Sequence, residues 1–252
     1  MGKGLEEYIK DLFAGTVNET NEQNRNFALS NVFSYLGNQN NPPDAMLRGG
    51  DAIEVKKIES NGSSLALNSS YPKAKLFVDS PMISATCRTC EECSIKDMIY
   101  AFGIVPNGSG VLSSLAMVYG DDYCADKAVY EKIKNIIKCG IQSIPNVEFA
   151  ETNELGRINR VDPLGITYLR VRGMWGIENP FSVFDYLFRR DHSKSFNFMC
   201  IINEYKWNTF DNTAELLALL GKINGLSITD GQIKSPNNPA QLKNVKLITF
   251  VL

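Results

Sequence analysis

The sequence has only one histidine, and this scarcity limits the chemistry open to the protein. His192 lies in the polar segment Arg-Arg-Asp-His-Ser-Lys, which predicts a surface loop. A Ser-His-Asp or Cys-His hydrolase needs a histidine oriented beside its nucleophile. A single histidine in such a segment argues against both classes of enzyme.

The sequence also lacks a long apolar segment. No run approaches the roughly 18 consecutive apolar residues that a membrane-spanning helix needs, so we expect no membrane partner. The first residues show neither the apolar region of a signal peptide nor the hydroxyl residue of a myristoylation motif. We therefore expect a cytoplasmic protein whose six cysteines are reduced thiols.

There is no excess of positive charge either. The net charge of −2 is not that of a protein that coats DNA nonspecifically, so any DNA contact needs a local concentration of cations. The 252 residues, 44% of them hydrophobic, are enough for one large domain with its own core. Because no repeat or linker-like stretch divides the chain, we expect a single domain over residues 1–252.

Helical and strand patterns are mixed along the chain. Apolar residues at helical spacing from Leu5 to Phe13, followed by Gly15, predict an amphipathic helix. Similar patterns predict helices over 27–36, 126–140 and 214–220, the second one with Gly140 at its end. Apolar runs predict strands over 45–47, 52–56, 65–67, 98–105, 114–119, 166–171, 198–202 and 247–252. The order predicts an α/β fold with a mixed central β-sheet flanked by helices.

Three cysteines at steps of three, Cys87, Cys90 and Cys93, allow two interpretations. The spacing is typical of a metal site, but zinc sites usually combine two such pairs, or cysteines with histidines. The alternative is a helix over about 84–100 that places the thiols along one packed stripe. We favour the packed stripe, because the remaining cysteines and the histidine are remote in sequence.

The segment over about 43–58 carries charged residues where a buried pair of strands would carry hydrophobic ones. Its two predicted strands are joined by Arg-Gly-Gly, which is typical of a tight bend. Since side chains alternate along a strand, Glu54 and Lys56 share one face, and Asp44 can lie beside Glu54 across the hairpin. Two carboxylates and an ammonium would then form a site for a divalent cation and a phosphodiester.

Three further acids lie close to this hairpin in sequence or on a nearby predicted helix. Asp51 is near enough to act as a second metal ligand or to replace Asp44. Glu6 and Glu7 lie on the first turn of the N-terminal helix, from which either could reach a metal. The helix dipole also favours solvated acids at these positions, and we prefer that interpretation.

The pattern Pro43-Asp44, a spacer and Glu54-Val-Lys56 resembles the core of the PD-(D/E)xK nucleases. The alternative is an edge hairpin whose charges face water. Longer strings resemble the NgoPII family of type II restriction endonucleases and run in order along nearly the whole chain. They cover residues 41–47, 50–60, 66–76, 115–126, 166–176 and 237–240.

This resemblance implies a restriction-endonuclease-like core and a Mg²⁺-dependent hydrolysis of both strands of double-stranded DNA at a short palindromic site, GGCC. Asp44 and Glu54 would hold Mg²⁺, with Asp51 as a further metal ligand, and Lys56 would orient or deprotonate the attacking water. A two-fold homodimer would match a palindrome. Two alternatives are a structure-selective repair or junction-resolving nuclease and a noncatalytic DNA-binding protein.

The segment over about 157–176 is the most basic part of the chain and the candidate for reading DNA. Its arginines are Arg157, Arg160, Arg170 and Arg172, against one acid between them. On a strand, Arg170 and Arg172 point the same way, which suits contacts with guanine O6 and N7. Alternatively, these arginines pair with nearby acids or phosphates.

Three residues outside the arginine set are also candidates for contact with DNA. Lys73 and Lys75 would contact DNA phosphates or form plain surface charge. Trp175 could stack on a base, although a buried aromatic anchor is the commoner role.

Overall fold

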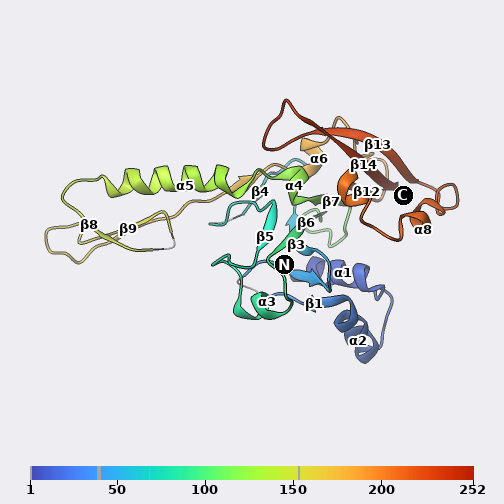
Figure 1. Ribbon diagram of the computed structural model, residues 1–252, viewed down its shortest axis with the longest axis horizontal. Coiled ribbons are helices and arrows are strands. Elements are labelled where there is room, and N and C mark those ends of the chain that lie inside the picture. Colours follow the sequence, from blue (N-terminus) through green and yellow to red (C-terminus); the bar gives the residue numbers. More distant parts are fainter. Residues whose placement is uncertain (1, 39–40, 68, 153) are drawn as a thin grey trace.

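A mixed β-sheet forms the centre of the computed structural model, which describes residues 2–38, 41–67, 69–152 and 154–252 (Figure 1). In spatial order its strands are β1 (Phe33–Tyr35), β2 (Ala45–Leu47), β3 (Ala52–Ile58), β6 (Ile95–Ile104), β7 (Ser114–Tyr119), β12 (Asn197–Asn203), β14 (Leu242–Val251) and β13 (Leu226–Lys234). β3 pairs with β6, and β7 with β12, in parallel, whereas the other neighbours are antiparallel. A short strand, β5 (Lys75–Phe77), also pairs with β6. The predicted mixed α/β fold is confirmed.

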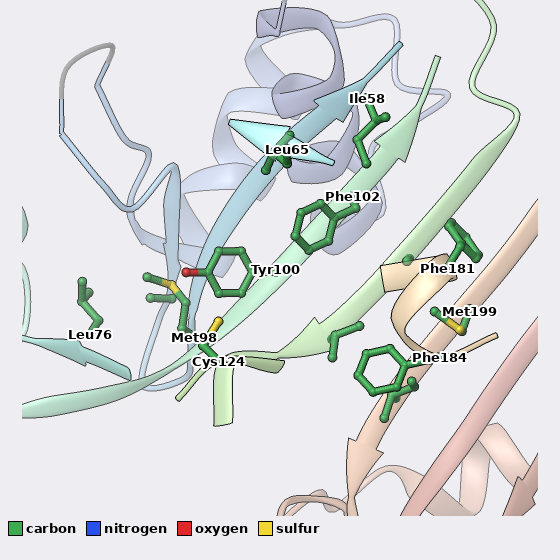
Figure 2. Packing of buried hydrophobic residues seen from close by; sticks show 14 of the residues in the cluster. Ile58, Leu65, Leu76, Met98, Tyr100, Phe102, Cys124, Phe181, Phe184 and Met199 are labelled. Carbon is green, nitrogen blue, oxygen red and sulfur yellow. The ribbon is translucent and has the colours of Figure 1, made fainter. Parts of the chain in front are cut away.

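Both faces of the central strands are buried, which explains why β6 is apolar along most of its length. On one face Tyr100 and Phe102 pack with Met199 and with two phenylalanines at α6 (Pro180–Val183), as Figure 2 shows. The opposite face is covered by α1 (Lys3–Ala14), α2 (Glu22–Val32) and α7 (Glu204–Trp207). Gly103 allows α1 to approach closely, because a Cβ there would lie 2.6 Å from a methyl group of Leu5.

An arm extends away from the central sheet (Figure 1). It consists of α5 (Lys127–Gln142) and a three-stranded antiparallel sheet of β8 (Glu148–Ala150), β9 (Gly156–Asn159) and β10 (Leu169–Val171). None of the α5 residues, all of which the structure describes, is buried. Its apolar stripe is 42–58% exposed and comprises Val129, Ile133, Ile136 and Ile137. The predicted stripe is therefore an open surface of the arm.

The remaining elements are short. β4 (Leu65–Ala66) pairs with β11 (Gly176–Ile177), and the other helices are α3 (Ala85–Thr89), α4 (Gly120–Tyr123) and α8 (Thr213–Leu217). Across the described residues, no helix is both long and apolar enough to cross a membrane.

Two of the predicted helices are wrong in extent. The helix predicted over 27–36 begins at Glu22, because the Asn21 side chain accepts hydrogen bonds from the Gln23 and Asn24 amides and caps it. The chain leaves this helix at Phe33 to form β1. The helix predicted over 84–100 is only α3, since residues from Ile95 onward fill the place between β3 and β7 in the sheet.

The structure also differs from prediction at other element boundaries, including the starts of β6 at Ile95 and of β14 at Leu242. Gly140 lies inside α5 and does not end it. The strand predicted over 166–171 is restricted to β10, and β13 was not predicted at all. By contrast, the strand predicted over 114–119 matches β7.

Candidate active site

The β2–β3 hairpin presents the predicted charged residues on the central sheet. Its register pairs Ala45 with Ile53 and Met46 with Ala52, and one further step places Asp44 opposite Glu54. The bend uses Gly49 at a φ of 65°, a conformation that glycine adopts without strain. β3 is also paired along its whole length with the buried strand β6, so the hairpin is held rigidly.

Asp44, Glu54 and Lys56 come together as the alternation along β3 predicts. The Lys56 Nζ donates a hydrogen bond to Glu54 Oε1 at 2.5 Å. The Val55 amide donates to Asp44 Oδ2 at 2.7 Å, so the Asp44 carboxylate is oriented by the neighbouring strand. The structure therefore places two carboxylates and one ammonium on one side of the hairpin.

The three groups affect one another's ionisation. Burial, and next the charge of Glu54, raise the pKa of Asp44 to about 7, although Lys56 and the Val55 amide oppose this. Burial alone would lower the pKa of Lys56, but the charges of Glu54 and Asp44 raise it above its ordinary value. The site thus has a surplus of negative charge that a cation would relieve.

The donor set fits a hard divalent cation. Glu54 Oε2 is buried and has no hydrogen-bond partner among the described residues. Such an atom costs about 1–3 kcal/mol unless something binds it, and a cation would do so. In the described part of the chain, no group of three or more His, Cys, Asp or Glu residues is placed to hold a metal. Two carboxylates suffice for Mg²⁺, which keeps several waters and takes further oxygens from a substrate phosphate.

The two acids of the first turn of α1 have different surroundings. Glu7 is bound by Arg25 at 2.7 Å and by Lys10 at 3.2 Å. The charge of Glu6, in contrast, affects Asp44. It adds to the raised pKa of Asp44, of which burial is the largest cause. Of this pair, Glu7 is engaged in ion pairs, and the charge of Glu6 affects Asp44.

Asp51 is not brought together with Asp44 and Glu54. It belongs with the odd-numbered residues of the hairpin, which face α1 and α7, and it is bound by Lys206 at 2.7 Å and by the Tyr119 hydroxyl at 2.8 Å. The geometry therefore does not support its predicted role as a metal ligand. Its partner Lys206 was not predicted, because it lies far away in the sequence.

The two lysines predicted to bind phosphate, Lys73 and Lys75, also differ in their partners. Lys75 pairs with Asp97 at 2.9 Å and with Asp121 at 3.1 Å, and Asp97 links it to Lys206. The charge of Lys73, in contrast, interacts with those of Glu54 and Lys56. Lys75 is thus part of an ion-pair network, whereas the Lys73 amide binds the hydroxyl of Tyr100, the register partner of Glu54.

The arginines of the 157–176 segment lie on the arm. As predicted, Arg170 and Arg172 point the same way, and both bind Glu154, at 2.6 Å and 2.7 Å. Arg157 is the cross-strand neighbour of Arg170 and stacks on a tyrosine ring. Arg160 is exposed, and its Nε lies 3.5 Å from a carboxylate oxygen of Glu148. The alternative of pairing with a nearby acid thus applies to Arg170 and Arg172 and, at a longer distance, to Arg160.

Cys87 and Cys90 pack in the core, whereas Cys93 lies beyond the end of α3, so the predicted helical stripe of three thiols is wrong for Cys93. Cys87 is buried, and burial raises the pKa of its thiol to about 11. The Cys90 sulfur lies 3.7 Å from that of Met46, next to the hairpin.

Two other residues singled out in the sequence are also placed. His192 lies in an exposed turn, as predicted. Trp175 makes edge contacts with Tyr71 and Tyr130, which favours the role of an aromatic anchor.

A mixed sheet with two carboxylates and a lysine on one hairpin is the arrangement expected of a PD-(D/E)xK nuclease. The model of the NgoPII restriction endonuclease family matches residues 1–234, and the chain belongs to this family. A protein of Neisseria gonorrhoeae described as type II restriction enzyme NgoPII is 61% identical over 251 residues, which cover 100% of this chain and 89% of that protein. No solved structure matches the chain. The predicted class, a type II restriction endonuclease, is confirmed.

Proposed function

We propose that the protein hydrolyses double-stranded DNA at a short palindromic site and that Asp44 and Glu54 hold the Mg²⁺ it requires. The observation that carries this proposal is the convergence of these carboxylates with Lys56, together with the buried Glu54 oxygen that has no partner in the described structure. Bound Mg²⁺ would polarise the phosphate and lower the pKa of a bound water.

The protein groups then have separate tasks. The Val55 amide keeps one Asp44 oxygen fixed, so the other is presented to the cation. Lys56, held by Glu54 as an ammonium with a raised pKa, orients the attacking water, and the proton that this water loses passes to the solvent. The water oxygen bonds to phosphorus, one ester P–O bond breaks, and the departing sugar oxygen gains a proton. The ammonium also stabilises the negative charge that increases on phosphorus-bound oxygens.

The proposed target is GGCC, which the family resemblance implies. Arg170 and Arg172 are the leading candidates for its guanines, with Arg157 and Arg160 beside them on the arm. In this proposal the DNA replaces Glu154 as the partner of the two guanidinium groups, since guanine O6 and N7 accept bidentate contacts.

A homodimer is the proposed assembly, because one active site per strand matches a two-fold symmetric target. The exposed apolar stripe of α5 supports an interface with a second copy, since monomers rarely expose large contiguous apolar patches. Sedimentation of the purified protein with and without DNA tests this assembly. The proposed location is the cytoplasm, where chromosomal and incoming DNA are both accessible.

A digest of plasmid DNA with and without Mg²⁺ tests the activity. Discrete fragments that end at GGCC, formed only with Mg²⁺, are the expected result. A smear, or nicking at branched structures, would instead indicate a structure-selective nuclease. No cutting under any metal would indicate a noncatalytic DNA-binding protein and contradict the proposal.

A further inference from the structure

The backbone of Lys73 is fixed directly over the catalytic face of the sheet. Its amide donates a hydrogen bond to the Tyr100 hydroxyl at 2.7 Å. Tyr100 is the register partner of Glu54 in the β3–β6 pair, so both side chains project from the same face. Figure 2 shows the Tyr100 hydroxyl on the side of the ring away from Phe102.

A second contact holds the same segment in place. A Cβ at Gly120 would lie 2.6 Å from the Lys73 carbonyl oxygen and 2.4 Å from that of Ala74. Only glycine allows the start of α4 to approach the backbone so closely. The position of Lys73 is therefore determined by the core and does not depend on its own side chain.

The ammonium of Lys73, unlike its backbone, has no partner in the described parts of the chain: no hydrogen bond or ion pair involves it. Burial is the main cause of a lowered pKa of Lys73; the charge of Glu54 opposes this lowering, and that of Lys56 adds to it. Lys75, two residues later, is bound by two carboxylates. A half-buried cation without a counterion is costly, and an anionic ligand would offset the cost.

Lys73 also lines a cleft of about 660 Å³ between residues 69–82 and α5. The other lysines along it are Lys75, Lys127, Lys134 and Lys138. Among the described residues, neither Asp44, Glu54 nor Lys56 lines this cleft. Three acids, Asp126, Glu131 and Glu154, also line the cleft, so its lysines outnumber its acids. Lys73 thus belongs to this cleft and, through the hydrogen bond of its amide to Tyr100, lies next to the register partner of Glu54.

We propose that Lys73 is a further catalytic residue, whose ammonium binds a nonbridging oxygen of the scissile phosphate. The inference rests on the proposed function, because its ligand is the substrate of that reaction. Lys56 is bound to Glu54 and acts on the water, whereas Lys73 is free to act on the phosphate. Negative charge on the nonbridging oxygens increases during the reaction, so a fixed cation accelerates it.

A coupling experiment without metal tests the contact itself. Binding of wild type and Lys73→Gln is measured in EDTA with two duplexes, one natural and one carrying a neutral methylphosphonate at the scissile position. The ratio of the two dissociation constants gives the effect of the phosphate charge for each protein. Lys57→Gln is the matched control, because Lys57 is the next residue after Lys56, lies on the opposite face and pairs with Glu59.

If Lys73 binds the scissile phosphate, the ratio of dissociation constants for the methylphosphonate and natural duplexes should be about tenfold larger for wild type than for Lys73→Gln. This is the size expected of one charge-assisted hydrogen bond. Lys57→Gln should give the wild-type ratio. An equal ratio for wild type and Lys73→Gln would overturn the proposal. Equal thermal midpoints of the variants establish that any change comes from the contact and not from folding.

Single-turnover cleavage in Mg²⁺ provides the second readout. Lys73→Gln should cut about 100-fold more slowly, Lys73→Arg should recover part of the rate, and Lys57→Gln should match wild type. Wild-type cleavage by Lys73→Gln would also overturn the assignment. If wild type itself does not cut, the proposed function fails, and this outcome is distinct from the loss of the Lys73 contact alone.

Discussion

Replacement of Asp44 by Asn should stabilise the metal-free protein, and the gain should increase with pH. Asparagine has nearly the same shape, and its side-chain oxygen can still accept the hydrogen bond from the Val55 amide. It removes only the negative charge that is buried beside Glu54. The pH dependence therefore isolates the electrostatic cost of the Asp44 carboxylate.

The magnitude follows from the raised pKa. The Asp44 pKa is 3.8 in its ordinary state and about 7 in the fold, so the folded protein binds more protons between these values. The favourable contribution of the protonated group is fully present below pH 3.8 and is lost as the pH rises through about 7. At about 1.4 kcal/mol per pKa unit, the free energy of unfolding is reduced by about 4 kcal/mol at pH 8 relative to low pH. On the order of 2–3 kcal/mol of this reduction occurs between pH 5 and pH 8.

The assay is urea unfolding of wild type and Asp44→Asn in EDTA at several pH values from 5 to 8. At each pH the Asp44→Asn variant should have the higher free energy of unfolding. Its advantage over wild type should increase by on the order of 2–3 kcal/mol between pH 5 and pH 8. Mg²⁺ at pH 8 should then stabilise wild type but leave the Asn variant nearly unchanged, because ligand binding stabilises only the protein that holds the ligand.

Asp51→Asn is the control, and its effect should have the opposite sign. Asp51 is the partner of Lys206 and Tyr119, so its loss should destabilise the protein at pH 8 by about 1–3 kcal/mol. A pH-independent difference between wild type and Asp44→Asn, or an Asn variant that is less stable at pH 8, would refute the electrostatic description of the site.

Two further predictions concern specificity and the segment over the active site. Arg170→Ala or Arg172→Ala should weaken binding to GGCC by about 1–3 kcal/mol more than binding to an unrelated duplex at fixed salt, whereas equal losses would make them phosphate contacts. Gly120→Ala should destabilise the protein by about 1–3 kcal/mol in urea unfolding and slow cleavage, because its Cβ collides with the Ala74 carbonyl. Unchanged stability would contradict the close approach.

The hairpin could be predicted because its pattern is local. Strand alternation alone places Glu54 and Lys56 on one face, and the two-glycine bend places Asp44 opposite Glu54. The same alternation assigns Asp51 to the face of Ile53, which weighs against a common site with Glu54. Its partner Lys206 is 155 residues away, and no local pattern indicates such a contact.

Tertiary strand pairing that overrides a local helical pattern explains the largest error in the fold. The cysteine spacing suggests a helix through residue 100, but only Ala85–Thr89 is helical. Pairing of β6 with both β3 and β7 buries Met98, Tyr100 and Phe102 completely or nearly so, and this tertiary gain outweighs a weak helical pattern. The thiol of Cys87 is nevertheless packed in the core, as the stripe interpretation required.

The roles of the basic residues depend on contacts that sequence cannot supply. Alternation predicts that Arg170 and Arg172 share a face, but not that Glu154 binds both. Lys73 and Lys75 are equivalent in the sequence, yet only Lys75 meets acids. The difference arises from the packing of their segment on Tyr100 and Gly120.

Single-turnover cleavage by Glu54→Gln tests the central claim most directly. The substrate is a duplex with one GGCC site, and the enzyme is in excess, so that wild type and variant are compared at equal DNA occupancy in Mg²⁺. The account predicts that wild type cuts at this site and that the variant binds the duplex with similar affinity but cuts about a thousandfold more slowly. A variant that binds equally and cuts at the wild-type rate would contradict the assignment of Glu54, and with it the proposed metal site.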